Sequence, residues 1–181
     1  MNSVSSPCPE ELLSELIELR RPVSFRSEGM SMHPFIRKGD TVTIVPYPGE
    51  SPGGPIRVGD IVFLQNDKGR WFVHRLIRVK GRENIVTKGD SLLQADEPVS
   101  GRLIRGRVAL VERNNSKRKY RLDGFTERVV ARLIALLSRM EACIFSICLR
   151  FKPRFSDRDY MPAIRKGIKF PKWFLIRIFF P

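Results

Sequence analysis

The sequence predicts a mainly β fold, a coiled antiparallel sheet with a short N-terminal helix before it and a basic amphipathic helix after it. Between residues 23 and 112, six short segments rich in β-branched and aromatic residues have the character of strands. Turn-forming Gly-Asp pairs recur beside these segments, at residues 39–40, 59–60 and 89–90. Beyond residue 117 the apolar residues instead follow the period of a helix.

Each expected element has its own signal. Pro9 suits a first helical turn and opens an amphipathic helix that ends near Arg20. The stretch Pro46–Pro55 holds four prolines and three glycines and is typical of an exposed loop. The expected strands are, in order, Val23–Arg26, Thr41–Val45, Ile61–Leu64, Trp71–Val79, Asn84–Thr87 and Leu103–Glu112. We therefore expect an N-terminal helix over residues 1–21, a β-domain over 22–122 and a basic, aromatic appendage over 123–181.

The predicted C-terminal helix, Phe125–Leu149, is apolar over most of its surface. Four arginines fall within about 40° of one another at ~100° per residue, and they are Arg128, Arg132, Arg139 and Arg150. Glu141 is a charge out of place among Val, Leu, Ile and Phe. This pattern predicts a helix that lies in a membrane interface with its arginine stripe outward. The alternative is a basic helix packed on the β-domain.

The formal net charge of +14 favours an anionic partner. Residues from Arg128 onward contribute +9 of it, and cations there alternate with aromatic residues such as Trp173 and Phe174. Such a mixture suits the headgroup layer of an anionic membrane, although the same rings could stack on nucleic-acid bases. We expect neither a signal peptide nor a spanning helix. The basic helix and tail instead predict a protein associated with the cytoplasmic membrane, or alternatively a cytoplasmic one.

Two residue counts argue against metal and disulfide chemistry. The three cysteines, Cys8, Cys143 and Cys148, lie outside the segment that carries the candidate motifs and are expected to be free thiols. Only two histidines, His33 and His74, are present, which argues against zinc. No metal or cofactor is predicted.

Three motifs in order could supply a nucleophile, a base and an orienting acid. Ser31 lies in Gly-Met-Ser-Met-His-Pro, where Gly29 would allow a positive φ or another tight approach. His74 lies in a predicted strand and shares a face with Phe72 and Leu76, so it should point inward. Asp90 and Asp96 are the candidate orienters of its imidazole. Such a set can perform acyl transfer.

Each motif also has a simpler interpretation. Ser31 could be a solvated serine in a glycine turn, His74 a core histidine, and Asp90 a turn former after Gly89. His33 is close to Ser31 in the chain, but residues two apart do not face each other, so His74 is the preferred base.

These residues resemble the boxes of the signal peptidase I and LexA-like serine peptidases over about Val23–Val111. Gly-Met-Ser-Met-x-Pro is similar to the nucleophile box of both branches. Val-His-Arg-Leu-Ile at 73–77 is similar to the box in which most bacterial members carry lysine, and its histidine resembles the endoplasmic-reticulum and SipW-like signal peptidases. Lys88-Gly89-Asp90 with Asp96 resembles the third box of that branch, and Gly101–Val111 its closing strand.

The resemblance implies a Ser31/His74/Asp96 site with Asp90 in support. It also implies a cleft that binds an extended peptide as an added strand, with pockets for small side chains. The expected function is therefore a signal-peptidase-type serine endopeptidase, which cleaves signal or leader peptides after small residues. Three features depart from the pattern. Ser91-Leu92 replaces Asn-Asn, and Gly29 lies where many signal peptidases carry a hydroxyl that helps the oxyanion hole. We also expect a C-terminal basic appendage in place of the usual N-terminal membrane anchor.

Two other functions remain open. A LexA-like self-cleaving regulator would need a DNA-binding module, which the roughly twenty residues before the β-domain cannot hold, and an Ala-Gly or Cys-Gly bond upstream of Ser31, which is missing. A catalytically silent module that binds peptide or nucleic acid through the basic tail is the other alternative.

Overall fold

The computed structural model describes residues 19, 21–46, 56–65, 69–81, 83–116, 118–150 and 171–180. The expected helix Pro9–Arg20 apart from Leu19, nearly all of the Pro46–Pro55 loop and Cys8 lie outside these residues. Seven strands form one antiparallel sheet, and their bounds are β1 Val23–Arg26, β2 Thr41–Pro46, β3 Ile61–Gln65, β4 Trp71–Val79, β5 Ile85–Lys88, β6 Ile104–Glu112 and β7 Lys119–Arg121. The predicted mainly β class is confirmed.

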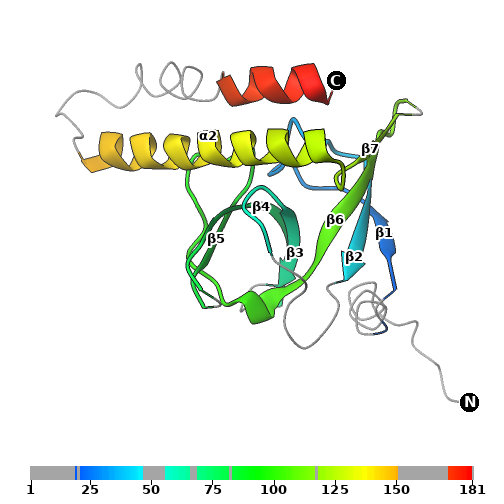
Figure 1. Ribbon diagram of the computed structural model, residues 1–181, viewed down its shortest axis with the longest axis horizontal. Helices are drawn as coiled ribbons and strands as arrows, with labels where there is room; N and C mark the ends of the chain where they lie inside the picture. Colours follow the sequence, from blue (N-terminus) through cyan, green and yellow to red (C-terminus); the bar gives the residue numbers. More distant parts are fainter. Residues whose placement is uncertain are drawn as a thin grey trace, which may run out of the picture.

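The strand order is β1-β2-β6-β3-β4-β5, and β7 pairs with the end of β6. The sheet bends strongly, so that β3, β4 and β5 curve away from β1 and β2 (Figure 1). Register shifts in the β2–β6, β3–β6 and β4–β5 pairs mark the irregularities of the ladder, as β-bulges do where sheets bend. The arrangement brings β4, which carries His74, between β3 and β5.

Two short elements were not expected. Strand β7 lies inside the predicted β-domain, at residues for which no strand was expected. The 3-10 helix η1, Gly101–Leu103, precedes β6, so this strand begins at Ile104 rather than Leu103. The Ser100 side chain caps η1 by accepting a hydrogen bond from the Arg102 amide at 3.3 Å.

Helix α2, Phe125–Arg150, extends along one end of the sheet, and the helical residues 171–179 lie beside it (Figure 1). Val130 and Ile134 of α2, and Ile176 and Phe180 of the C-terminal segment, share one hydrophobic core with strands β1, β2 and β3. The segment 123–181, expected to be a separate appendage, therefore contributes described residues to the core of the β-domain.

Helix α2 packs closely against the Gly59-Asp60 turn of the β-domain. Gly59 has a φ of 105°, which favours glycine, and a Cβ there would lie 2.8 Å from the backbone carbon of Ala131 in α2. The Asp60 carboxylate accepts a hydrogen bond from the Arg57 amide at 3.0 Å and closes the turn. One face of α2 is therefore packed on the β-domain, as the alternative interpretation of this helix predicts.

Arg113 joins the C-terminal end to the loop that follows Ser31. Its guanidinium donates to the Phe35 carbonyl at 2.8 Å, to the Phe180 carbonyl at 3.0 Å and to the Asp40 carboxylate at 2.6 Å. All of these contacts are buried, and charge-assisted hydrogen bonds of this kind are the stronger ones. The loop is therefore anchored at its base.

Candidate active site

His74 and Asp96 meet as the sequence predicts. His74 lies in β4, is 7% exposed and points inward, as expected from the alternation of its strand. Its Nδ1 lies 2.6 Å from Asp96 Oδ2. A carboxylate on Nδ1 fixes the ring orientation and favours the tautomer whose Nε2 is free to accept a proton.

The backbone and a hydroxyl hold Asp96 in place. Its amide donates to the Thr87 carbonyl at 2.9 Å, and the Thr87 hydroxyl donates to Asp96 Oδ2 at 2.7 Å. Thr87 lies in β5 opposite Leu76 of β4, two residues after His74. The sheet pairing itself thus sets the distance between the imidazole and its carboxylate. Sequence reasoning assigned no role to Thr87.

Asp90 does not contact His74, and the hypothesis that it orients the imidazole is not supported. Both of its oxygens accept hydrogen bonds from Arg75, at 2.8 and 3.0 Å, and both side chains are fully buried. Burial alone would raise the pKa of the Asp90 carboxyl, but the Arg75 guanidinium, with Lys172 and Lys88, holds it below its usual range. Asp90 therefore ties the turn after Gly89 to β4 through Arg75.

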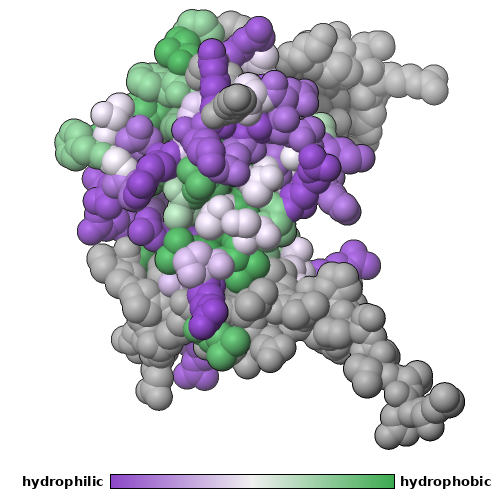
Figure 2. Space-filling view, turned by 90° about the vertical axis from the view of Figure 1, so that its right-hand side faces the viewer, coloured by the Kyte–Doolittle hydropathy of each residue, from purple (hydrophilic) through white to green (hydrophobic). Residues whose placement is uncertain are grey.

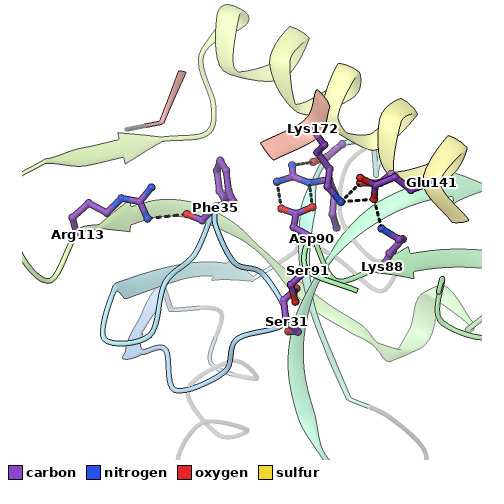
Figure 3. A network of polar contacts seen from close by, with 11 residues as sticks. Ser31, Phe35, Lys88, Asp90, Ser91, Arg113, Glu141 and Lys172 are labelled. Atoms are coloured by element: carbon purple, nitrogen blue, oxygen red, sulfur yellow. Dashed lines mark hydrogen bonds and ion pairs between the residues drawn. The ribbon is translucent and has the colours of Figure 1, made fainter. Parts of the chain in front are cut away.

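That turn positions Ser31. The Ser91 amide and hydroxyl donate to the Ser31 carbonyl at 2.8 and 3.0 Å, and the same hydroxyl lies 2.9 Å from the Met30 carbonyl. A Cβ at Gly89 would lie 2.7 Å from the Ser31 carbonyl oxygen, so only glycine allows this approach. Figure 3 shows Ser31 and Ser91 side by side next to Asp90. Ser91, predicted only as a departure from a family pattern, is thus a positioning residue.

Gly29 differs from its expected role. It is absent from the positive-φ glycines among the described residues, and a Cβ there would meet no atom within 4 Å. Glycine is required for the tight approach at position 89 rather than at 29. Gly29 instead leaves open space beside Ser31.

The structure brings Ser31 to the segment that also carries Asp96, but no hydrogen bond joins Ser31 to His74 among the described residues. Catalytic hydrogen bonds are often long before substrate binds and shorten in the complex. The Ser31 amide makes no backbone hydrogen bond within the described part of the chain, which leaves it available to an oxyanion. His33, half-buried, has its pKa lowered by burial and by the Arg37 and Arg113 guanidinium groups, and it does not take part in the His74–Asp96 pair.

A second ionic cluster joins helix α2, strand β5 and the C-terminal segment. Glu141 of α2 accepts from Lys88 of β5 at 2.8 Å and from Lys172 at 2.7 Å, and all three side chains are buried (Figure 3). Burial, together with the Lys172 charge, lowers the pKa of Lys88 to about 8 against the opposing effect of Glu141. Glu141 is therefore not misplaced in its helix, because its partners come from two other segments.

A groove of about 480 Å³ opens at Ser31. Its wall and floor are mainly apolar, and Phe25, Phe63 and Trp71 are prominent among the lining residues. The Trp71 ring stacks on Phe63 at 4.8 Å, and Phe63 is 5.7 Å from Phe25. The volume lies within the range of about 300–1,000 Å³ that is usual for ligand sites.

Comparison of the chain with protein-family models gives no match, and the searches of curated proteins and of solved structures give none either.

Proposed function

We propose that this protein is a serine endopeptidase of the signal-peptidase type, in which Ser31 is the nucleophile, His74 the general base and Asp96 the orienter of the imidazole. The observation that carries the proposal is the contact of 2.6 Å between His74 Nδ1 and Asp96 Oδ2, beside a serine that the same segment positions through Ser91. The carboxylate on Nδ1 leaves Nε2 as the ring nitrogen that can take up and release the serine proton.

The reaction follows from these roles. Ser31 Oγ attacks the carbonyl carbon of the cleaved peptide bond while His74 Nε2 takes its proton, and Asp96 stabilises the imidazolium through Nδ1. The negative charge that develops on the carbonyl oxygen can be met by the Ser31 amide. The imidazolium then gives its proton to the leaving amine, and water hydrolyses the resulting ester by the same base. The expected substrates are signal or leader peptides.

Mass spectrometry of a peptide library incubated with the full-length chain tests this function. The wild-type protein should cleave a consistent subset of peptides, and Ser31→Ala, whose hydroxyl is only partly buried, should fold normally and cleave none. Ser91→Ala is the informative companion, because it removes one of the two donors to the Ser31 carbonyl and should slow cleavage without abolishing it. Equal cleavage by the wild type and Ser31→Ala would refute the assignment.

We also propose that the protein docks on an anionic membrane surface, because α2 has three faces rather than two. At ~100° per residue its buried face spans about 200–340° from Arg128, the exposed arginine stripe about 0–40° and an exposed apolar face about 60–160°. This apolar face comprises Val129, Leu133, Leu136, Met140, Ile144 and Ile147. The exposed Trp173, Phe174, Ile178 and Phe179 of the C-terminal segment add to the apolar surface of the helix layer.

Cations and apolar residues lie next to each other on this layer. Figure 2 shows hydrophobic and hydrophilic residues adjacent at the top of the molecule, the end at which Figure 1 places the helices. An apolar face flanked by arginines is typical of helices that lie in the membrane interface, where each cation adds about 1 kcal/mol near an anionic surface. None of the helices in the described part of the chain is long and apolar enough to span a bilayer.

Vesicle co-sedimentation of the full chain tests the docking. Because residues of α2 and of the C-terminal segment belong to the core, point variants are better suited than truncation. Binding to anionic vesicles should weaken in Leu136→Glu and Ile147→Glu, and it should weaken with salt. Val79→Glu places the same charge on an exposed apolar residue of β4 and should bind like the wild type. Equal binding by all three variants would contradict the proposal.

A further inference from the structure

The groove beside Ser31 is too large and too aromatic for alanine alone. Its volume of about 480 Å³ is lined by Phe25, Phe63 and Trp71 together with the buried Met32 and Ile36. A methyl group would leave most of this apolar surface in contact with water. A larger apolar side chain would bury it, at about 25 cal/mol for each Å² removed from water.

The position of the groove suits an extended peptide. Strand β1 is at the end of the strand order, and among the described strands it pairs only with β2. Phe25 and Arg26 of β1 line the groove, as do Gly29 and Ser31 of the following loop. An unpaired strand edge is a template for an added strand, whose main chain supplies hydrogen bonds and whose alternate side chains enter pockets.

The open space at Gly29 fits the same interpretation. No atom lies within 4 Å of the position of a Cβ at Gly29, although this residue lines the groove next to Ser31. Such a gap permits a peptide backbone to approach the nucleophile closely. In an extended peptide, side chains two residues apart point to the same side, so the first and third residues before the cleaved bond both face one wall.

On these grounds we infer that the groove binds substrates with a large aliphatic or aromatic side chain at the first or third residue before the cleaved bond. This inference rests on the proposed peptidase function. It departs from the expectation of pockets for small side chains that the family resemblance implies. Phe25, Phe63 and Trp71 are the residues that determine this specificity.

The test measures cleavage of two peptide series by the full-length protein, in which the first or the third residue before the bond is varied among Ala, Leu and Phe. In one series Leu or Phe should raise kcat/KM at least tenfold over Ala, because a single methylene in an apolar pocket discriminates by about 10–200-fold. Trp71→Ala should remove most of this preference. Trp173→Ala changes the tryptophan of the C-terminal segment, which does not line the groove, and should retain it.

Binding is measured separately, so that a folding defect in Trp71→Ala does not decide the outcome. In the double variant Ser31→Ala/Trp173→Phe, Trp71 is the only tryptophan, and its fluorescence should change when a Leu- or Phe-containing peptide is added and remain unchanged with the Ala peptide. Cleavage that favours Ala in both series would overturn the inference and leave the peptidase intact. Binding without cleavage by the wild type would support the groove and refute the proposed function. An unresponsive Trp71, as expected if residues 1–20 of the chain filled the groove, would overturn the inference.

Discussion

Replacing Glu141 by Gln is the substitution whose effect on stability the structure predicts most sharply. One carboxylate neutralises two buried ammonium groups, Lys88 at 2.8 Å and Lys172 at 2.7 Å. Gln keeps the shape of the side chain but leaves two buried cations without their ion-pair partner. Breaking a buried ion pair by removing one partner costs about 3–5 kcal/mol. Against a typical free energy of unfolding of about 5–15 kcal/mol, the loss should be large.

Denaturant unfolding followed by circular dichroism at neutral pH measures this loss. Glu112→Gln is the matched control, because Glu112 forms an ion pair with Lys119 at the surface, and such pairs contribute about 0–1 kcal/mol. Replacing Lys88, Glu141 and Lys172 together by Met should recover most of the stability, since apolar replacement of a whole buried ionic group is often neutral or favourable. If Glu141→Gln unfolded at the same denaturant concentration as Glu112→Gln, the cluster would not join the helices to the sheet as described.

Three further predictions concern the site and its support. Asp96→Asn should lower kcat with little change in melting temperature, because His74 loses its orienting carboxylate. Asp90→Asn should lower the free energy of unfolding by about 3–5 kcal/mol, because it leaves Arg75 unpaired. If Asp90→Asn instead lowered kcat and Asp96→Asn lowered the free energy of unfolding, the two roles would be exchanged. Gly29→Ser should fold normally, because its Cβ meets nothing within 4 Å, and should lower kcat/KM, because its side chain occupies the space by which the peptide approaches Ser31; an unchanged or raised kcat/KM would contradict that approach. Because burial lowers the pKa of Lys88 to about 8, the unfolded chain binds more protons between about pH 8 and 10, so stability should rise with pH over that range; Lys88→Met should flatten the rise, and equal slopes would contradict the shift.

The strands and the His74–Asp96 pair were predictable because their signals are local. Alternation placed β4 at Trp71–Val79 with His74 inward, and the Gly-Asp turns marked the ends of neighbouring strands. The resemblance then ordered the three boxes. Asp96 was preferred to Asp90 only through that resemblance, since spacing alone does not say which carboxylate a curved sheet brings to the imidazole.

The ionic groups could not be assigned in the same way, because their partners are distant in the sequence. Glu141 stood out as a lone acid among apolar helix residues, yet its partners are 53 and 31 residues away. Arg75 was a similar signal, a cation inside an apolar strand, which indicates a buried counter-charge. The exposed apolar face of α2 was inseparable from its buried face in the sequence, because both contain the same residue types.

The assignment of His74 as the general base is tested most directly by comparing the only two histidines of the chain. On one peptide that the wild-type protein cleaves, kcat/KM is measured for His74→Ala and for His33→Ala, with circular dichroism to verify that both fold. His74→Ala should lose on the order of 10⁴ in kcat/KM, as removal of a triad member does, and His33→Ala should keep most of the activity. Full activity in His74→Ala would contradict the proposed site.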